Sequence, residues 1–184
     1  MTIDLGAGDG RYVLHRAAEH PTELVLAIDA SHEAMRDASR RAAAPIHRGG
    51  LPNAAFLASG LEQLPAELAG FASLVTVHFP WGSLLRAATG QDAEGAAAVA
   101  RLVAPGGQLR LLVSAAERDA AGGVTALNPG DVVEAYCELG LRPLACRPAT
   151  ADDIAAARST WAKRLLSTGR DRVIWLIELG AAPS

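Results

Sequence analysis

The sequence has few of the residues that mark secreted, metal-binding or membrane proteins. It has two cysteines, Cys137 and Cys146, and their spacing matches no metal-binding motif. We expect both to be small buried residues of a reduced, cytoplasmic protein rather than partners in a disulfide. No apolar run approaches the ~18–20 residues that span a bilayer. The first residues are acidic, unlike the basic start of a signal peptide. A membrane protein is therefore excluded.

Basic charge is not in excess either. The chain has 17 Lys and Arg against 20 Asp and Glu, which gives a formal net charge of −3. Such a chain lacks the positive field of proteins that coat DNA or RNA without specificity. Lysine is nearly absent, since Lys163 is the only one, and we attribute this to codon usage rather than to function. The 184 residues fit one domain with a core that needs no disulfide or metal.

Apolar runs alternate with helical patterns along the chain, which predicts an α/β fold. Strands are expected at residues 1–5, 24–28, 54–59, 74–79, 108–114, 141–146 and 173–179. Helices are expected at residues 11–20, 32–43, 83–89, 92–103, 129–139 and 151–166. We therefore predict a mainly parallel seven-stranded sheet with helices on both faces. Such sheets bind ligands outside the carboxyl ends of their strands, so the residues after each strand form the candidate site.

A glycine-rich turn, DLGAGDG at residues 4–10, follows the first predicted strand and precedes a helix. Its glycines allow a sharp turn and a close approach to a ligand. A nicotinamide fingerprint would have a third glycine where this chain has Arg11. Asp4 would repel a pyrophosphate but suits a cationic group, such as the amino group of S-adenosylmethionine (SAM). The turn therefore favours SAM over a dinucleotide.

Three further features stand at the ends of predicted strands. Asp29 ends the second strand, where a carboxylate can accept hydrogen bonds from both ribose hydroxyls. Glu62 lies just past the third strand, where it can flank the adenine end of the cofactor. Pro105-Gly106-Gly107 precedes the fifth strand, as in SAM-dependent methyltransferases. Each motif alone can be a plain turn or a helix cap, but together they resemble the Rossmann-like class I methyltransferases.

The fourth predicted strand ends in His78-Phe79-Pro80-Trp81. In amino-group methyltransferases this place holds an Asp or Asn, followed by two prolines and an aromatic residue. That polar side chain accepts a hydrogen bond from the amine that is methylated. Phe79 takes its place here, whereas Pro80 and Trp81 are kept. The missing acceptor favours a ring nitrogen with a free lone pair, such as adenine N1.

Two groups of basic residues accompany these motifs. The first surrounds Trp161 near the end of the last predicted helix: Arg158, Lys163, Arg164, Arg170 and Arg172. The second lies at the end of the second predicted helix: Arg40, Arg41, His47 and Arg48. Aromatic and basic residues together are typical of RNA contacts. Trp161 can equally be a core residue, and Arg40 and Arg41 can serve only the helix macrodipole.

Five segments of the sequence together resemble one particular family. The segments DLGAGDGR, GGLPN, LPAELAG, FPWGSLL and TWAKRL, in this order, are similar to those of the 16S ribosomal RNA adenine-1408 N1 methyltransferases, which are aminoglycoside-resistance enzymes. The resemblance implies that Trp81 and Trp161 enclose a flipped adenine, in a catalytic site that Phe79 and Pro80 complete. With Asp4 and Gly8 of the glycine turn included, the expected SAM contacts are Asp4, Gly6, Gly8, Tyr12, Asp29, Leu61, Glu62, His78, Ser83, Ser159 and Thr160. The expected RNA contacts are Arg40, Arg41, Arg48, Lys163, Arg164, Arg170 and Arg172.

The sequence thus predicts one SAM-dependent methyltransferase domain over residues 1–184, with RNA contacts at about 40–50, 79–90 and 158–172. The resemblance implies a cytoplasmic monomer that acts on 16S rRNA in the 30S subunit and releases S-adenosylhomocysteine. No metal, DNA or membrane partner is expected. Two alternatives stay open. One is a small-molecule methyltransferase that encloses an aromatic substrate between the same tryptophans. The other is a SAM-binding protein with little turnover, held on RNA or on a partner protein.

Overall fold

The computed structural model describes residues 1–114, 127–160 and 173–183. The strands are β1 (Thr2–Leu5), β2 (Val25–Asp29), β3 (Ala54–Ala58), β4 (Ala72–His78), β5 (Val103–Val113), β6 (Leu141–Pro148) and β7 (Trp175–Ala181). The α-helices are α1 (Arg11–Glu19), α2 (His32–Ala42), α3 (Gly82–Ala88), α4 (Ala93–Arg101), α5 (Pro129–Glu138) and α6 (Ala151–Ala156). Short 3-10 helices are η1 (Ile46–Arg48), η2 (Leu61–Gln63) and η3 (Ala66–Leu68).

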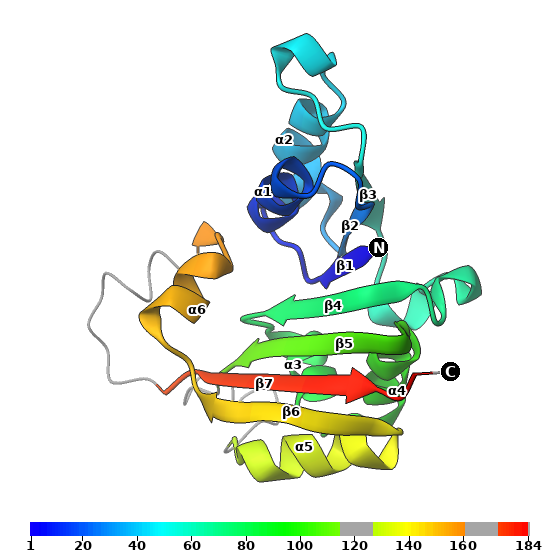
Figure 1. The fold of residues 1–184 in the computed structure, drawn as a ribbon, viewed down its shortest axis with the longest axis vertical. Helices are drawn as coiled ribbons and strands as arrows, with labels where there is room; N and C mark the ends of the chain where they lie inside the picture. Colours follow the sequence, from blue (N-terminus) through cyan, green and yellow to red (C-terminus); the bar gives the residue numbers. More distant parts are fainter. Residues whose placement is uncertain (115–126, 161–172, 184) are drawn as a thin grey trace.

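The strands form one seven-stranded sheet in the order β3-β2-β1-β4-β5-β7-β6. β7 runs antiparallel to β5 and β6, whereas the other neighbouring strands are parallel. Residues of α3, α4 and α5 share one core cluster with the sheet, and α1 and α2 pack in separate clusters on the other face (Figure 1). This confirms the predicted α/β fold. The strand order reverses between β1 and β4, and their carboxyl ends form the crevice where such sheets bind ligands.

A row of polar side chains crosses the middle of this sheet. Asp4 pairs in register with Thr76, Thr76 with Arg110, and Arg110 with Glu178, across β1, β4, β5 and β7. Residues in register point to the same face of a sheet. Asp4 and Thr76 are buried, and farther along the row Arg110 Nε lies 3.4 Å from Glu178 Oε1. The row therefore places a carboxylate and its partner next to the crevice between β1 and β4.

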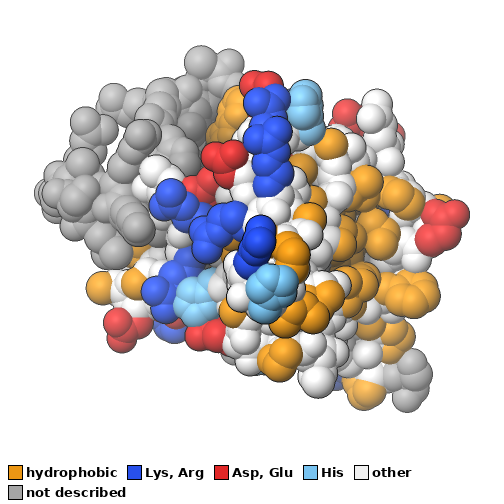
Figure 2. Space-filling model, turned by 90° about the horizontal axis from the view of Figure 1, so that it is seen from above, with side chains coloured by type: hydrophobic (Ala, Val, Ile, Leu, Met, Phe, Trp, Pro, Cys, Tyr) orange, Lys and Arg blue, Asp and Glu red, His pale blue; other side chains and the backbone are white. Residues whose placement is uncertain are grey.

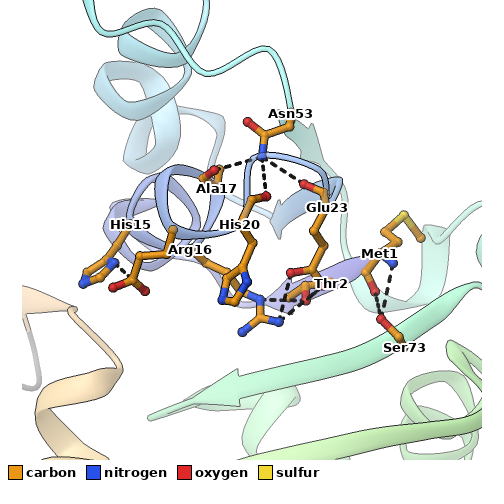
Figure 3. A network of polar contacts seen from close by, with 10 residues as sticks. Met1, Thr2, His15, Arg16, Ala17, His20, Glu23, Asn53 and Ser73 are labelled. Atoms are coloured by element: carbon orange, nitrogen blue, oxygen red, sulfur yellow. Dashed lines mark hydrogen bonds and ion pairs between the residues drawn. The ribbon is translucent and has the colours of Figure 1, made fainter.

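The side chain of Asn53 fastens the end of α1 to the start of β3. Its Nδ2 donates to the carbonyl oxygens of Ala17 at 2.9 Å, His20 at 3.0 Å and Glu23 at 2.9 Å (Figure 3). The last carbonyls of a helix have no partners within the helix, so an outside donor stabilises them. This contact explains the asparagine of the GGLPN segment, because it sets the position of β3 relative to α1.

The last predicted helix, over residues 151–166, is wrong in its length. α6 ends at Ala156, and Arg158 has a φ of 52°, which no α-helix accommodates. Ala157 is buried in a cluster with Phe79 and Leu112. Tertiary packing therefore overrides the helical propensity of the alanine-rich sequence.

β5 begins earlier than predicted. The helix expected over residues 92–103 ends at Arg101, and β5 begins at Val103. The turn at residues 105–107 was expected to precede this strand, but it lies inside β5. The pairing register with β4 shifts between Ala72 and Leu74. The turn is therefore accommodated as an irregularity of the strand.

The two cysteines are unpaired, but the prediction that they are buried is wrong, because both are exposed. Cys146 lies on β6, which is an edge strand of the sheet, and Cys137 lies near the end of α5. In the part of the chain that the structure describes, no helix is both long enough and apolar enough to cross a membrane.

Candidate active site

A pocket of about 470 Å³ lies at the carboxyl ends of β1 and β4. Its lining includes every described residue that the sequence predicted for the cofactor or the catalytic site: Asp4, Gly6, Gly8, Tyr12, Asp29, Leu61, Glu62, His78, Phe79, Pro80, Trp81, Ser83, Ser159 and Thr160. Trp161 lies outside the described residues. Within the described residues, no group of three or more His, Cys, Asp or Glu side chains is placed to hold a metal ion. Segments that are far apart in the sequence therefore meet in one pocket.

The glycine turn lines this pocket. Gly6 has a φ of 69°, a backbone conformation that favours glycine, and a Cβ there would also displace the end of the Leu84 side chain, which would lie 2.5 Å away. The Gly8 N–H donates to Asp29 Oδ2 at 2.8 Å, and the Ser31 N–H donates to Asp29 Oδ1 at 2.8 Å. A carboxylate has about four acceptor positions. Asp29 is thus held in place by the backbone and can still accept hydrogen bonds from a ligand.

Asp4 is a buried carboxyl group with one short hydrogen bond. Thr76 Oγ1 donates to Asp4 Oδ1 at 2.6 Å, and His78 Nδ1 lies 3.5 Å from the same oxygen. Burial raises the pKa of Asp4 from 3.8 to about 7, the hydrogen bond from Thr76 works against this rise, and the charge of Asp29 adds to it. Near neutral pH Asp4 is therefore partly protonated, and a cationic ligand would favour its charged form.

His78 lines the pocket with an uncharged imidazole. Burial and, to a lesser extent, the charge of Arg110 together lower its pKa to about 3. Its ring packs edge-on against Tyr12, with ring centroids 4.6 Å apart and planes at 80°. Nδ1 has no hydrogen-bond partner among the described residues. An imidazole with such a low pKa is a poor base, so its packing rather than proton transfer accounts for its place.

The turn after β4 presents an indole at the mouth of the pocket. Phe79 has a φ of 51°, its N–H donates to the carbonyl of Leu112 at 2.9 Å, and its side chain packs in the cluster around Leu112. Pro80 is buried, whereas Trp81 is 80% exposed. α3 begins directly afterwards at Gly82. A tryptophan with most of its surface in solvent is available for a flat ligand.

Ion pairs attach α6 to the sheet below it. Arg147 Nη1 donates to Asp153 Oδ2 at 2.7 Å, and Arg110 Nη2 donates to Asp153 Oδ1 at 3.2 Å. Asp153 also completes the capping box with Thr150. The hydrogen bond from Arg147 is the main reason that the pKa of Asp153 lies well below its usual range, and Thr150 contributes to it. These contacts fix where α6 begins and hold its first turn against the sheet.

The segment after α6 reaches across to the glycine turn. Thr160 Oγ1 donates to Asp9 Oδ2 at 2.6 Å, and Arg11 Nε lies 3.4 Å from the same oxygen. Ser159 and Thr160 both line the pocket. Asp9 therefore joins two walls of the pocket that lie 151 positions apart in the sequence.

The second basic group lies on the surface next to α2. Arg40, Arg41 and Arg48 are exposed, in the last turn of α2 and in η1. Figure 2 looks onto this end of the molecule and shows arginine side chains gathered there. The other predicted RNA contacts lie outside the described residues: Lys163, Arg164, Arg170 and Arg172.

Sequence reasoning missed several residues of the site. Thr76 belongs to it because strand order places β4 beside β1, which no local motif reveals. Asp9 stands inside the glycine turn, yet its partner is Thr160 at the far end of the chain. Ser59 and Gly60 line the pocket directly after β3, where the position alone was a usable signal.

Comparisons with known proteins agree with this arrangement. The family profile "NpmA: 16S rRNA (adenine(1408)-N(1))-methyltransferase" matches residues 1–181. A 16S rRNA (adenine(1408)-N(1))-methyltransferase of Streptoalloteichus hindustanus is 37% identical over an alignment of 184 positions, which covers 94% of this chain and 82% of that protein.

Two crystal structures are also similar. The aminoglycoside resistance methyltransferase NpmB1 has a TM-score of 0.80 at 33% identity, over 98% of this chain and 86% of that one. A mutant of the 16S rRNA (adenine(1408)-N(1))-methyltransferase from Catenulisporales acidiphilia, solved with cosubstrate SAM, has a TM-score of 0.83 at 27% identity, over 98% and 85% of the two chains. The chain therefore belongs to the NpmA family of 16S rRNA (adenine(1408)-N(1))-methyltransferases.

Proposed function

We propose that this protein transfers the methyl group of SAM to N1 of adenosine 1408 in the 16S rRNA of the 30S subunit, and that this modification gives aminoglycoside resistance. One observation carries the proposal: in a chain that the family profile matches over residues 1–181, a tryptophan that is 80% exposed stands at the mouth of the pocket. Site, family and expected chemistry point to the same reaction.

The residues of the pocket fit SAM. The buried carboxyl of Asp4 suits the amino group of the ligand's methionine part, and Asp29 suits its ribose hydroxyls. Gly6 lines the pocket and has no side chain, so a ligand can approach the backbone of the turn closely. Glu62, on η2, lines the same pocket, and we assign it to the adenine end of the cofactor. A family member has been solved with SAM, which supports this assignment.

Catalysis rests on positioning. SAM supplies a methyl group that its sulfonium already activates, and adenine N1 has a free lone pair at neutral pH. No residue has to remove a proton from the target, which agrees with Phe79 in place of a polar acceptor and with the low pKa of His78. Holding two reactants in line can lower a barrier by ~7–11 kcal/mol. The chain's task is therefore to fix the base against the cofactor.

Two indoles would hold the base. Taking a base out of its stack costs a few kcal/mol, and stacking on Trp81 and Trp161 offsets this by ~1–3 kcal/mol per contact. Positive charge moves onto the ring as N1 is alkylated, and tryptophan faces attract cations by ~0.5–2 kcal/mol. The tryptophans would thus stabilise the transition state more than the neutral base, which is what raises the rate.

The same domain would also dock on the RNA, by residues at about 40–50, 79–90 and 158–172. Exposed Arg40, Arg41 and Arg48 supply positive charge beside α2, and arginines of this kind bind folded RNA through phosphates and shape. We expect the enzyme to act as a monomer in the cytoplasm, where 30S subunits are found.

A primer-extension assay on 30S subunits tests the proposal. N1-methyladenine blocks base pairing, so subunits treated with enzyme and SAM should give a stop at adenosine 1408. Subunits treated without SAM should give none. SAM binding without any stop would overturn the proposal and favour a SAM-binding protein with little turnover or an enzyme that acts on a small molecule.

A further inference from the structure

Arg158 has a backbone conformation that arginine rarely adopts. Its φ is 52°, in the left-handed region that favours glycine. Among the described residues Phe79 is the only other non-glycine residue with a positive φ, whereas nine glycines have one. The chain thus uses glycine for this conformation almost everywhere. An arginine at this position therefore indicates a need for its side chain.

The two exceptional side chains differ in what they contact. Phe79 packs into the cluster with Leu112 and Ala157, so its side chain helps to hold the turn after β4. Arg158 is exposed, and it forms no ion pair with any residue in the described ranges. Packing within the fold therefore explains why a phenylalanine stands at position 79 despite its positive φ. It does not explain why an arginine stands at position 158.

Arg158 stands at the rim of the pocket. Its neighbours Ala157 and Ser159 both line the pocket, whereas its own exposed side chain does not. Ala157 is 1% exposed, and Thr160 donates its 2.6 Å hydrogen bond to Asp9. The segment is therefore fixed on both sides of Arg158, and the charge is held outside the mouth of the pocket.

We propose that Arg158 is a positioning residue that binds an RNA phosphate beside the flipped adenosine. This inference rests on the proposed function. A nucleotide whose base enters the pocket leaves its phosphates outside the mouth, and a guanidinium binds two phosphate oxygens at once. The contact would form only after the base has left its stack. It would therefore stabilise the flipped state rather than the first encounter with the ribosome.

Because the contact forms after docking, its loss should affect the methylation rate and subunit binding differently. Loss of the contact should lower the methylation rate at saturating 30S subunits and should leave subunit binding within about threefold of the wild type. Arg158→Gly is the sharpest variant, because glycine removes the charge and also suits the backbone conformation. Arg158→Lys keeps a charge, and Arg101→Ala removes an exposed arginine at the end of α4 as a matched control.

The experiment measures tritium transfer from labelled SAM to purified 30S subunits under saturating conditions, with SAM affinity and Tm for each variant. Arg158→Gly should transfer at least about tenfold more slowly, which is the effect of one charge-assisted hydrogen bond. Its SAM affinity should be unchanged and its Tm at least that of the wild type. Arg158→Lys should fall between Arg158→Gly and the wild type, because lysine keeps the charge but cannot bind two phosphate oxygens at once. Arg101→Ala should retain the full rate.

Two results would overturn the inference. If Arg158→Gly transfers methyl groups at the wild-type rate, Arg158 has no role in the reaction. If Arg158→Gly loses SAM affinity in proportion to its rate, the residue acts on the pocket and not on RNA. Wild-type enzyme that leaves adenosine 1408 unmethylated would instead overturn the proposed function, and the role of Arg158 with it.

Discussion

Thr76 donates a 2.6 Å hydrogen bond to Asp4, so a neighbour on β4 supports the charged form of a buried carboxyl group on β1. Burial nevertheless raises the pKa of Asp4 to about 7. The native state of the free protein thus favours the protonated carboxyl relative to the unfolded chain. The free energy of unfolding therefore falls as pH rises from about 4, where Asp4 of the unfolded chain ionises. The fall ends above pH 7, where Asp4 is ionised in the folded protein as well.

The first prediction concerns Asp4→Asn. The amide cannot ionise, so above pH 7 the variant should be more stable than the wild type in the absence of ligand. Its affinity for SAM should fall at least about tenfold, because a cationic amino group loses a charge-assisted contact. Thermal denaturation at pH 5 and pH 8 and calorimetric titration with SAM check both parts. A stability gain that is equal at both pH values would contradict the explanation.

The second prediction is a pH dependence of SAM binding. If Asp4 must be charged to hold the amino group, SAM binding should release a proton, and affinity should decline as pH falls below about 7. Thr76→Val removes the hydrogen bond that lowers the pKa of Asp4, so the decline should begin at a higher pH. Thr89→Val is the matched control, since Thr89 is also buried and its Oγ1 donates to the Leu85 carbonyl at 2.8 Å, away from the pocket. Identical pH profiles for all three proteins would contradict the role of Thr76.

Much of this site could be predicted from the sequence because it depends on local features. A glycine turn after a strand, an acid at the end of the next strand and a tryptophan after the fourth strand each mark one position. Parallel strands bring their carboxyl ends to one edge, so Gly6, Asp29 and Trp81 had to converge once the strands were identified.

The features that could not be predicted depend on contacts between distant segments. The Thr76–Asp4 pair follows from strand order and register, and no pattern within β4 indicates it. The end of α6 follows from the burial of Ala157, which an alanine-rich sequence does not reveal. Exposure of Cys146 follows from the place of β6 at the edge of the sheet.

The third prediction concerns Trp81→Ala and Trp161→Ala. Each should abolish methylation of 30S subunits, because the flipped base loses one of its two stacking partners. SAM affinity should stay nearly intact in both. Phe71→Ala is the control for Trp81, since Phe71 is 66% exposed and lies outside the pocket. The stacking role is wrong if SAM binding collapses in both variants along with activity.

The fourth prediction concerns the arginines beside α2. Arg41→Glu and Arg48→Glu should weaken 30S binding, and their affinities should depend less steeply on salt, by about one unit of slope for each lost phosphate contact. The binding constant measured at several salt concentrations checks this. Arg101→Glu makes the same charge change at an exposed position of α4 and should have no effect. Equal binding by all these proteins would remove α2 and η1 from the docking surface.

The fifth prediction concerns Asn53→Leu. The amide donates to three carbonyl oxygens around the end of α1, and leucine would leave them without this donor (Figure 3). We expect the free energy of unfolding to fall by about 1–3 kcal/mol, since lost partners of partly buried polar groups cost this much. Asn53→Asp should be destabilising as well, because it keeps the shape of the side chain but removes both donors. Gln91→Leu makes the same kind of change at an exposed position and should alter stability by less than about 0.5 kcal/mol. Urea denaturation checks all three variants, and unchanged stability of Asn53→Leu would show that the position of β3 does not depend on this side chain.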